Sequence, residues 1–573
     1  MTHRRRSSFA SILLSFVVAA VTASTIVLTA CSSNDARRPG NIDGGTTPAP
    51  TLTTVPTAHP TAPGSGTPPL ATPVLSPQGA NVATCATVQF VEDGGFGSGT
   101  WSVSSPDAGG GTISATGLYT APKQDPIVGD GGVTRSSTPA TITYKEAMRG
   151  AATATVNYAT AFPGAEAIVP IGTNPKATQN VPFEHIFAAN RSGSKRVYAV
   201  VNGPTSPSKV EIYVSNNGGA SFTGPTLYNT GADVNYVTAA VDAANSNILY
   251  MVYYAAYPGP AFGTSVRLAV SLDGGMTFPN EYVIADSNST MPEFGAPDVT
   301  SPGPDQVIVA GVGVSANVNG AYAAAFTSNN HGQNIGVQGT VGVRPTSGGQ
   351  SYATSLKNEG TVHADCGPDQ NGNQATVRVF ANASGAACMV YRWVGSGCPS
   401  PNADVVQCSS NSGSTWSAPL ALVTPQSISR DIPTGALSPN GTVAVTWLEK
   451  VGTEDEVHVA FSMNGGASFP TRSVYPKATR TRFSGVDTFR PVVQWEAENL
   501  WLSQTFDASN QASVVVDKTC DYGTTWSGAL QFGKANATDI YQTLGLVPGG
   551  TPNAMTLFVA KNTNQLVSIT LTK

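Results

Sequence analysis

Charged side chains are scarce in this sequence. Asp, Glu, Lys and Arg make up 11% of its 573 residues, whereas soluble domains usually contain about 25%. With a formal net charge of −5 and no basic patch, binding to nucleic acid is excluded as a function class. Long amphipathic helical patterns are also missing, while Gly (60 residues) and Pro (41 residues) are abundant. The composition predicts an all-β fold of short strands and turns, and the length predicts several domains.

Motifs for cofactors and for common catalytic centres are missing as well. No nucleophile elbow, Walker loop or dinucleotide fingerprint occurs, because the glycines fall in turns between strands rather than before helices. The histidines beyond residue 75 have neither the spacing of zinc ligands nor a Cys-x-x-Cys companion. We therefore expect no cofactor and no histidine-based metal centre. Surface or turn positions are expected for His185, His331, His363 and His458.

The N-terminus is typical of an export signal. Arginines at positions 4–6 precede a long apolar run, which ends in Leu28-Thr29-Ala30-Cys31. This tetrapeptide resembles the box of bacterial lipoproteins, which implies a lipid on the Cys31 thiol and attachment to a membrane. By the same resemblance, Ser32 favours the outer membrane or cell surface. An uncleaved transmembrane helix is the alternative for residues 1–31, since about 20 apolar residues span a bilayer.

Residues 32–75 are rich in Pro, Thr, Gly and Ser and contain almost no large apolar side chains. Such a segment buries too little surface to offset the entropy of ordering. Proline favours extended polyproline II, at ~3.1 Å per residue. We expect a disordered stalk that holds the following domains away from a membrane.

Residues 76–160 contain short strand patterns separated by turn clusters. Trp101 in one strand, with Phe90 and Tyr119 able to face it, predicts the core of a small β-sandwich. The stretch GTISATGLYTAP (111–122) resembles bacterial immunoglobulin-like modules of surface proteins. The resemblance implies a spacer domain, with adhesion as the alternative.

One octapeptide turn, represented by SLDGGMTF (271–278), occurs six times within residues 165–573. Its Asp or Asn is suited to accept backbone N–H groups, its Gly to take a positive φ, its hydroxyls to close the loop and its aromatic residue to fill the adjacent layer. Repeats of about 50 to 80 residues predict a β-propeller with four strands per blade, whose turns staple successive blades. The Asp or Asn positions are Asn217, Asp273, Asn330, Asn411, Asn464 and Asp521.

Six units are expected to begin with an acidic residue that leads into the first strand. One further unit, starting at Val181, lacks that residue, so seven blades are favoured and six are the alternative. The segment EAIVPIGT (166–173) is expected to supply the fourth strand of the last unit and close the ring. The acidic residues are Asp233, Asp298, Asp365, Asp431, Asp487 and Asp539.

The repeated turns resemble the Asp-box of the bacterial neuraminidase repeat, and residues 165–573 look like the sialidase-type propeller superfamily. That superfamily contains sialidases, other glycosidases and binding scaffolds, so the function must be argued from the site. The arginine motif that sialidases carry before their first box is missing here, and its nearest echoes are Arg430 and Arg490. Glu184 and Tyr541 could be assigned as base and nucleophile, but they fit ordinary strand turns better.

The six acidic residues are expected to ring the mouth of the central funnel, on the face opposite the boxes, with Arg430 and Arg490 beside two of them. Two interpretations stay open: each carboxylate accepts N–H bonds from its own or a neighbouring turn, or together they form a polar face that binds a cation such as Ca²⁺. We expect a monomer that binds an extracellular glycan or protein on that face. A sialidase-like or other exo-glycosidase is the alternative.

Six cysteines remain besides Cys31, and export permits disulfides. Cys388 and Cys408 are expected to pair across a hairpin. Cys366 and Cys398, both on the face away from the boxes, form a second candidate pair. Cys85 and Cys520 lie in different domains and are expected to be free buried thiols.

Overall fold

The computed structural model describes residues 72–572 with internal gaps, and the described residues form strands and turns without any helix. Accordingly, no helix of the described part could span a membrane. The signal segment, Cys31 and nearly all of the stalk lie outside the described residues. The internal gaps are 96, 106–109, 124–127, 130–132, 135–138, 159–161, 172–185, 191–192, 203–208, 257–263, 287–292, 316–317, 334, 336–349, 353–366, 369–376, 395–402, 424–432, 452–453, 476–490, 508–511, 528–529, 533–540, 550–553 and 562–564.

Residues 72–158 form a small all-β domain, called here the N-terminal module. Phe90 and Tyr119 are buried in its core, as expected, with ring centroids 6.5 Å apart. Trp101 is half-buried and packs instead on Tyr144, at 4.8 Å between centroids.

Four sheets make up the N-terminal module. The first contains β2 (Gly79–Val82), β11 (Gly150–Tyr158), β10 (Ala140–Glu146) and β5 (Thr100–Ser104), and the second contains β3 (Thr87–Gln89), β7 (Leu118–Thr120) and β6 (Thr112–Ile113). Two further sheets have two strands each: β1 (Val74–Ser76) with β4 (Val91–Asp93), and β8 (Val128–Gly129) with β9 (Val133–Thr134).

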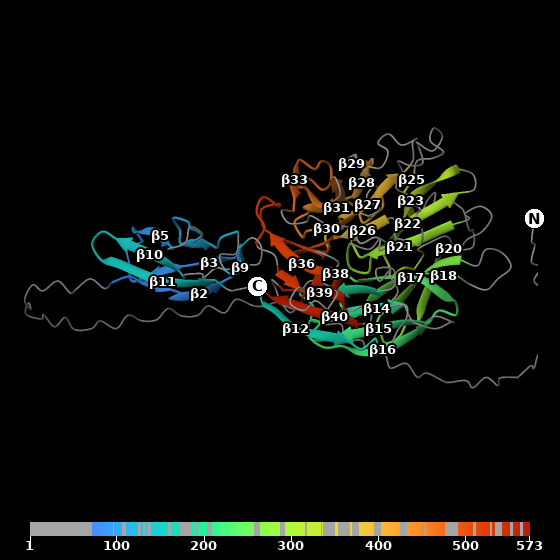
Figure 1. Cartoon of the computed structure of the whole chain (residues 1–573), viewed down its shortest axis with the longest axis horizontal. Coiled ribbons are helices and arrows are strands. Elements are labelled where there is room, and N and C mark those ends of the chain that lie inside the picture. Colours follow the sequence, from blue (N-terminus) through green and yellow to red (C-terminus); the bar gives the residue numbers. More distant parts are fainter. Residues whose placement is uncertain are drawn as a thin grey trace, which may run out of the picture. The chain divides into compact units, whose positions relative to one another are not determined.

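The described strands from Phe162 onward form seven sheets, which follow the repeats of the sequence (Figure 1). Sheet 1 contains β13 (Ile186–Asn190), β14 (Val197–Asn202), β15 (Lys209–Ser215) and β16 (Thr223–Asn229). Sheet 2 contains β17 (Asp233–Val241), β18 (Leu249–Ala256), β19 (Thr264–Ser271) and β20 (Asn280–Asp286). Sheet 3 contains β21 (Glu293–Thr300), β22 (Val307–Ser315), β23 (Val318–Ser328) and β24 (Gln350–Tyr352).

The remaining sheets are also antiparallel, but in sheet 4 both β25 and β26 pair with β27. Sheet 4 contains β25 (Gly367–Pro368), β26 (Val377–Ala381), β27 (Ala387–Val394), β28 (Asp404–Ser409) and β29 (Leu420–Val423). Sheet 5 contains β30 (Thr434–Leu437), β31 (Val443–Val451), β32 (Glu454–Ser462) and β33 (Thr471–Val474). Sheet 6 contains β34 (Val492–Glu496), β35 (Asn499–Asp507), β36 (Ala512–Thr519) and β37 (Leu530–Phe532). Sheet 7 contains β38 (Tyr541–Pro548), β39 (Ala554–Lys561), β40 (Gln565–Thr572) and β12 (Phe162–Val169).

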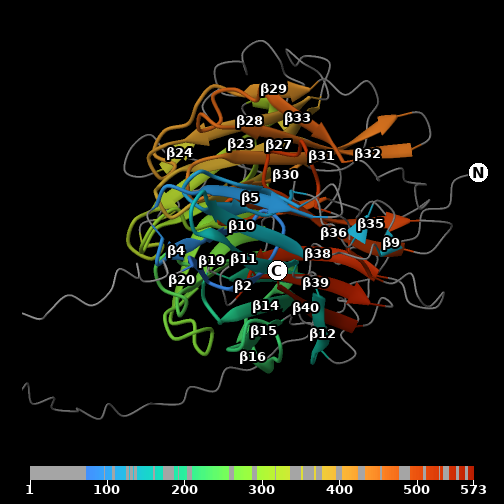
Figure 2. The ribbon, with the colours of Figure 1, turned by 90° about the vertical axis from the view of Figure 1, so that its left-hand side faces the viewer.

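The seven sheets close into a ring, which makes this part of the chain a β-propeller. Strand β12 pairs antiparallel with β40, so the expected segment supplies the outer strand of the last sheet. The inner strands contact one another in the circular order β13, β17, β21, β26, β30, β34, β38 and again β13. In both ribbon views β39 and β40 lie beside β14 and β15 (Figure 2). Ring closure therefore leaves no sheet of the propeller without a neighbour on either side.

The repeated turns connect the third and fourth strands, as predicted. In SLDGGMTF, Ser271 Oγ donates a hydrogen bond to Asp273 Oδ1 (2.8 Å), while the N–H groups of Gly275 and Thr277 donate to Ser271 Oγ and Asp273 Oδ1. Phe278 reaches back to the preceding sheet, with its ring 5.1 Å from that of Tyr228. The turns therefore staple neighbouring sheets, in agreement with the sequence pattern.

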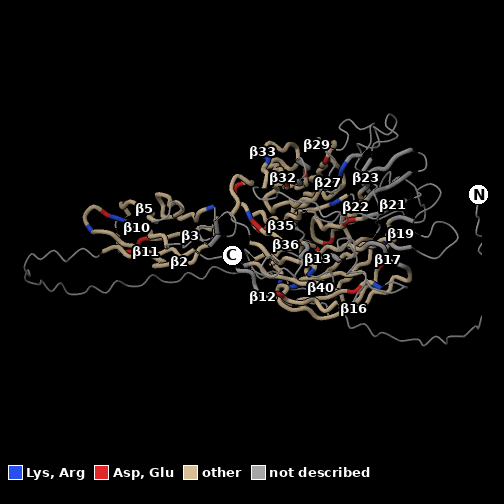
Figure 3. Tube along the Cα trace, viewed as in Figure 1, with Lys and Arg blue, Asp and Glu red and all other residues tan. Residues whose placement is uncertain are grey.

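The core of the propeller lies between neighbouring sheets. Seven clusters of buried apolar side chains each combine residues of two adjacent sheets, from sheets 1 and 2 around to sheets 7 and 1. Charged residues are sparse over the described strands (Figure 3), although β32 begins with three consecutive acidic residues, 454–456. Face-to-face burial of apolar side chains, rather than ion pairing, therefore holds the ring together.

Candidate functional site: a cavity in the propeller channel

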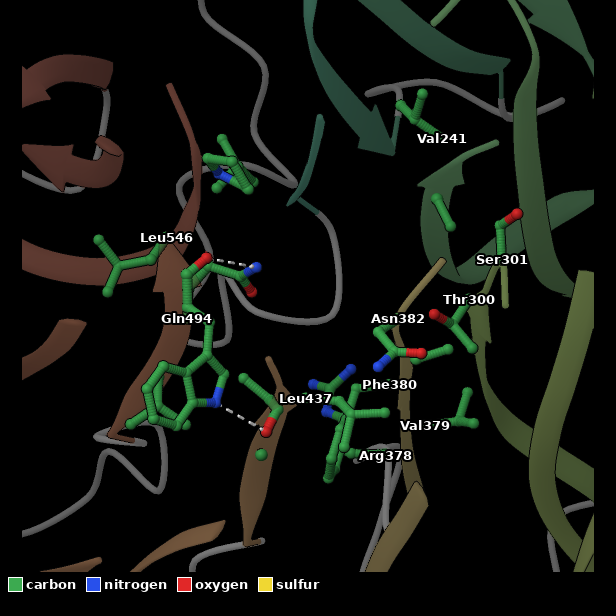
Figure 4. A pocket seen from close by; sticks show the side chains of 18 of the residues that line it. Val241, Thr300, Ser301, Arg378, Val379, Phe380, Asn382, Leu437, Gln494 and Leu546 are labelled. Carbon is green, nitrogen blue, oxygen red and sulfur yellow. Dashed lines mark hydrogen bonds between the residues drawn. The ribbon is translucent and has the colours of Figure 1, made fainter. Parts of the chain in front are cut away.

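The ends of the inner strands enclose a cavity of about 750 Å³ (Figure 4). Strands β17, β21, β26, β30, β34 and β38 contribute to its wall. The lining residues come from positions along these strands, including Thr434 and Val492 at the starts of β30 and β34, and from the turns that follow the strands. Inner strands run parallel to the third strands, whose C-terminal ends carry the Asp-box turns. Because the turns that follow the inner strands line it, the cavity reaches the box side of the channel.

The cavity wall is mostly apolar, with a few neutral polar groups. Phe380 is half-buried, and its ring covers Gly435, where an added Cβ would lie 2.4 Å from the ring. The side chains of Thr300 and Gln494 are directed into the space between the strands (Figure 4). Gln494 Nε2 makes a long hydrogen bond of 3.5 Å to Trp495 O, and the Thr300 hydroxyl has no partner among the described residues. Both groups are available to a ligand.

Asp298 and Arg378 are the charged residues of the described cavity wall, and they are bound to each other. Asp298 Oδ1 lies 3.7 Å from Arg378 Nη1 and accepts a hydrogen bond from Thr238 Oγ1 at 3.0 Å. Asp298 Oδ2 accepts one from Val379 N, also at 3.0 Å. The carboxylate of Asp298 is thus satisfied by groups of neighbouring strands.

The expectation that Asp298 leads into the first strand of its unit is wrong. Strand β21 begins at Glu293, so Asp298 is its sixth residue and is only 7% exposed. The pairing with β22 shifts register between Gly295 and Asp298. The chain joins the sheet five residues before Asp298, at Glu293, and carries Asp298 into the wall.

The other expected site residues are not brought together by the described structure. Asp233 is the first residue of β17, as predicted, and Tyr541 is the first residue of β38. The remaining candidates lie outside the described residues, so the binding face expected opposite the boxes stays a prediction. They are Asp365, Asp431, Asp487, Asp539, Arg430, Arg490, Glu184, Cys366 and Cys398.

The structure contains two described disulfides. Cys388 and Cys408 face each other in the β27–β28 ladder and form a bridge with a Cα–Cα distance of 4.1 Å, as the hairpin register predicts. The expectation of free buried thiols at Cys85 and Cys520 is wrong, because they form a bridge with a Cα–Cα distance of 6.2 Å. Both are half-buried and lie in turns, where the N-terminal module meets sheet 6. Sequence reasoning treated the two domains as separate and so missed this pair.

A polar cluster outside the cavity was not predicted from the sequence. Glu281, at the start of β20, accepts hydrogen bonds from Tyr228, Tyr253 and Arg267. Burial alone would raise the pKa of Glu281, but these three donors lower it below its usual value. A carboxylate so fully engaged stays ionised and stabilises the junction of sheets 1 and 2. No group of side chains in the described part of the chain is arranged to hold a metal ion.

Comparisons with known proteins give similarity at the level of solved structures only. No protein-family model and no curated protein matches this chain. A similar structure is an α-L-arabinofuranosidase of Fusarium graminearum, at 10% identity, covering 72% of this chain and 98% of that one with a TM-score of 0.33. A lectin from Burkholderia pseudomallei is 13% identical (68% and 96% covered, TM-score 0.40). The NanB sialidase from Streptococcus pneumoniae is 12% identical (79% and 86%, TM-score 0.38). At such values, no activity transfers to this chain.

Proposed function

We propose that this propeller binds an uncharged glycan in the channel cavity. The observation that supports this is a cavity of about 750 Å³ that offers Phe380, Thr300 and Gln494, while its charged residues are paired with each other. Sugars present hydroxyl groups to amides and hydroxyls, and their C–H faces to aromatic rings. A carboxylate-bearing sugar would need a guanidinium that is not already bound. Arg378 is held by Asp298, so a neutral saccharide fits better than an acidic one.

Binding is proposed rather than hydrolysis. Most glycoside hydrolases use two carboxyl groups, about 5–9.5 Å apart, on either side of the scissile bond. Among the described residues that line the cavity, Asp298 is the sole carboxylate, and three neighbours already engage it. The cavity wall thus offers contacts to a sugar without offering an acid and base pair.

The protein is proposed to act outside the cytoplasm, tethered through a lipid on Cys31 and a stalk of residues 32–75. The lipoprotein-like tetrapeptide and the proline-rich composition support this placement. Cys31→Ser is expected to leave the propeller folded and to abolish membrane attachment, because a single thiol carries the lipid. Metabolic labelling with a fatty-acid analogue measures this. Label that persists in Cys31→Ser would contradict it.

The ligand proposal is tested with neutral and acidic oligosaccharides on an array, followed by titration calorimetry of the best ligand. Gln494→Ala and Thr300→Val are each expected to weaken binding about 10-fold, the effect of losing one good hydrogen bond. Gln565→Ala is the matched control, since Gln565 is exposed on β40 outside the cavity. Unchanged affinity in both cavity variants would overturn the proposed site, and preference for acidic sugars would overturn the ligand class. Release of shortened sugars would favour the glycosidase alternative.

A further inference from the structure

The tip of the N-terminal module contacts the Asp-box turn of sheet 6. Both belong to one compact unit, residues 69–573. Cys85, in the turn between β2 and β3, is bonded to Cys520, which lies directly after β36. The two cysteines are 435 residues apart in the sequence. The bond joins a module that precedes the propeller to one of its last sheets.

Cys520 has no role within its own turn. It occupies the second position of the sixth box, and the hydrogen bonds of that turn use Thr519, Asp521 and Thr525 instead. The side chain at this position is exposed in the other five boxes, where it differs in size and polarity. Those residues are Asn216, Leu272, Asn329, Ser410 and Met463. A propeller alone therefore has no requirement for cysteine here, and its presence points to a partner outside the sheet.

A buried lysine lies beside the bond. Lys518 is 2% exposed, and its Nζ donates a hydrogen bond to Thr84 O of the module at 3.0 Å. The same amine lies 5.7 Å from the centre of the Trp501 ring. A buried ammonium group needs an acceptor to offset its lost hydration, and the module supplies one. The buried position of Lys518 is thus compatible with its charge because the N-terminal module contacts it.

An ion pair and a hydrogen bond also join described residues of the two parts. One ion pair joins Lys123 Nζ to Asp521 Oδ2 at 3.3 Å, but the Lys123 side chain is 56% exposed, and exposed pairs contribute little. The buried apolar cluster of the module contains no propeller residue among those described. The disulfide adds a covalent bond to these contacts.

We propose that Cys85–Cys520 is a latch, that is, a reversible disulfide that fixes the N-terminal module on sheet 6. With the bond closed, the module holds the propeller in one orientation and does not act as a freely rotating spacer. Closing the latch removes two electrons and two protons from the two thiols. A disulfide of the oxidising cell envelope takes them up by thiol–disulfide exchange, and a dithiol reductant returns them. The orientation of the propeller relative to the N-terminal module is then conditional on the redox state.

The latch is tested by distance measurements in the whole chain. Spin labels on non-natural side chains at the exposed positions Met148 (90% exposed) and Met276 (66%) report the separation of module and propeller. The oxidised protein is expected to give one narrow distance distribution. Cys520→Ser, or treatment with dithiothreitol, is expected to broaden it severalfold. Ser410 stands at the same position of another box, so Cys520→Ser leaves the turn intact.

Two controls separate the latch from its surroundings. Lys518→Met keeps the disulfide and should keep the narrow distance distribution. Removal of the bond in sheet 4, by Cys388→Ser with Cys408→Ser, should also leave the distance distribution narrow. Peptide mapping without reduction should recover the Cys85 peptide linked to the Cys520 peptide. A broad distribution in the oxidised protein, a narrow one in Cys520→Ser, or the absence of the linked peptide would each overturn the latch.

Discussion

At the scale of single residues, the fifth position of each Asp-box is fixed by two constraints. Gly466 has φ +89°, and a Cβ there would lie 2.2 Å from Cys408 Sγ of the preceding sheet. Gly219 has φ +91°, and a Cβ there would lie 2.8 Å from Thr556. The fourth position also has a positive φ, but it accepts the larger residues His331, Ser412 and Tyr522. Close approach between sheets, more than backbone conformation, therefore demands glycine at the fifth position.

Gly466→Ala is expected to destabilise the propeller by about 2–4 kcal/mol, since the methyl group adds overpacking to an unfavourable φ. Gly465→Ala is the matched control. It has φ +68°, and an added Cβ would meet nothing within 4 Å, so its cost should be about 1 kcal/mol. Urea unfolding of the three proteins measures the difference. Equal losses in both variants would show that contact with Cys408 is unimportant.

Two Asp-boxes contain Asp instead of Asn, at Asp273 and Asp521, and their contribution to folding stability should depend on pH in the acid range. Burial alone would raise the pKa of Asp273, but hydrogen bonds from Thr277, Ser271 and Met276 lower it below its usual value of 3.8. A lowered folded-state pKa contributes stability above pH 3.8, and this is lost as the pH falls through the folded-state pKa. Asp273→Asn should therefore be within about 1 kcal/mol of wild type at neutral pH and lose less stability in acid.

The reciprocal variant tests the same point. Asn464 Nδ2 donates to Ser468 Oγ, whereas Thr277 Oγ1 donates to Asp273 Oδ2, so the hydroxyl reverses its role between the two kinds of box. Asn464→Asp should consequently be tolerated at neutral pH and add acid sensitivity. Melting temperatures between about pH 7 and pH 2.5 measure both variants. Parallel pH profiles for all three proteins would refute the role of the carboxylate.

At the scale of elements, the closing strand β12 joins the two ends of the propeller. Val169 is buried in the cluster that connects sheets 7 and 1, while the neighbouring Ile168 is 61% exposed on the other face of the same strand. Val169→Asp is expected to cost about 3–4 kcal/mol, because it buries an unpaired carboxylate. Ile168→Asp should remain within about 0.5 kcal/mol of wild type. Thermal unfolding that failed to separate the two would place β12 outside the folded core.

The elements that could be predicted from the sequence are those with a local signature. The box turns carry their hydrogen-bonding residues within eight positions, and β12 could be assigned because the last unit lacks a strand. The cavity could not be predicted, because Thr300, Phe380 and Gln494 come from three different sheets and carry no common motif. Asp298 was misplaced because β21 begins at Glu293 and shifts register between Gly295 and Asp298, which no local motif indicates. The register of inner strands, which decides what faces the channel, is set by packing between sheets.

At the scale of the whole molecule, the two disulfides should differ in their access to reductant. Cys388 and Cys408 are 1% and 8% exposed and lie under the turn of the next sheet, so a thiolate reaches them only after sheets 4 and 5 separate. Cys85 and Cys520 are half-buried in turns. Because thiol–disulfide exchange requires access to a sulfur atom, we expect Cys85–Cys520 to be reduced at least about 10-fold faster in the folded protein. Timed alkylation with mass spectrometry measures both rates. Reduction of Cys388–Cys408 first, with the circular dichroism spectrum unchanged, would show that the sheet interface opens more readily than its burial indicates.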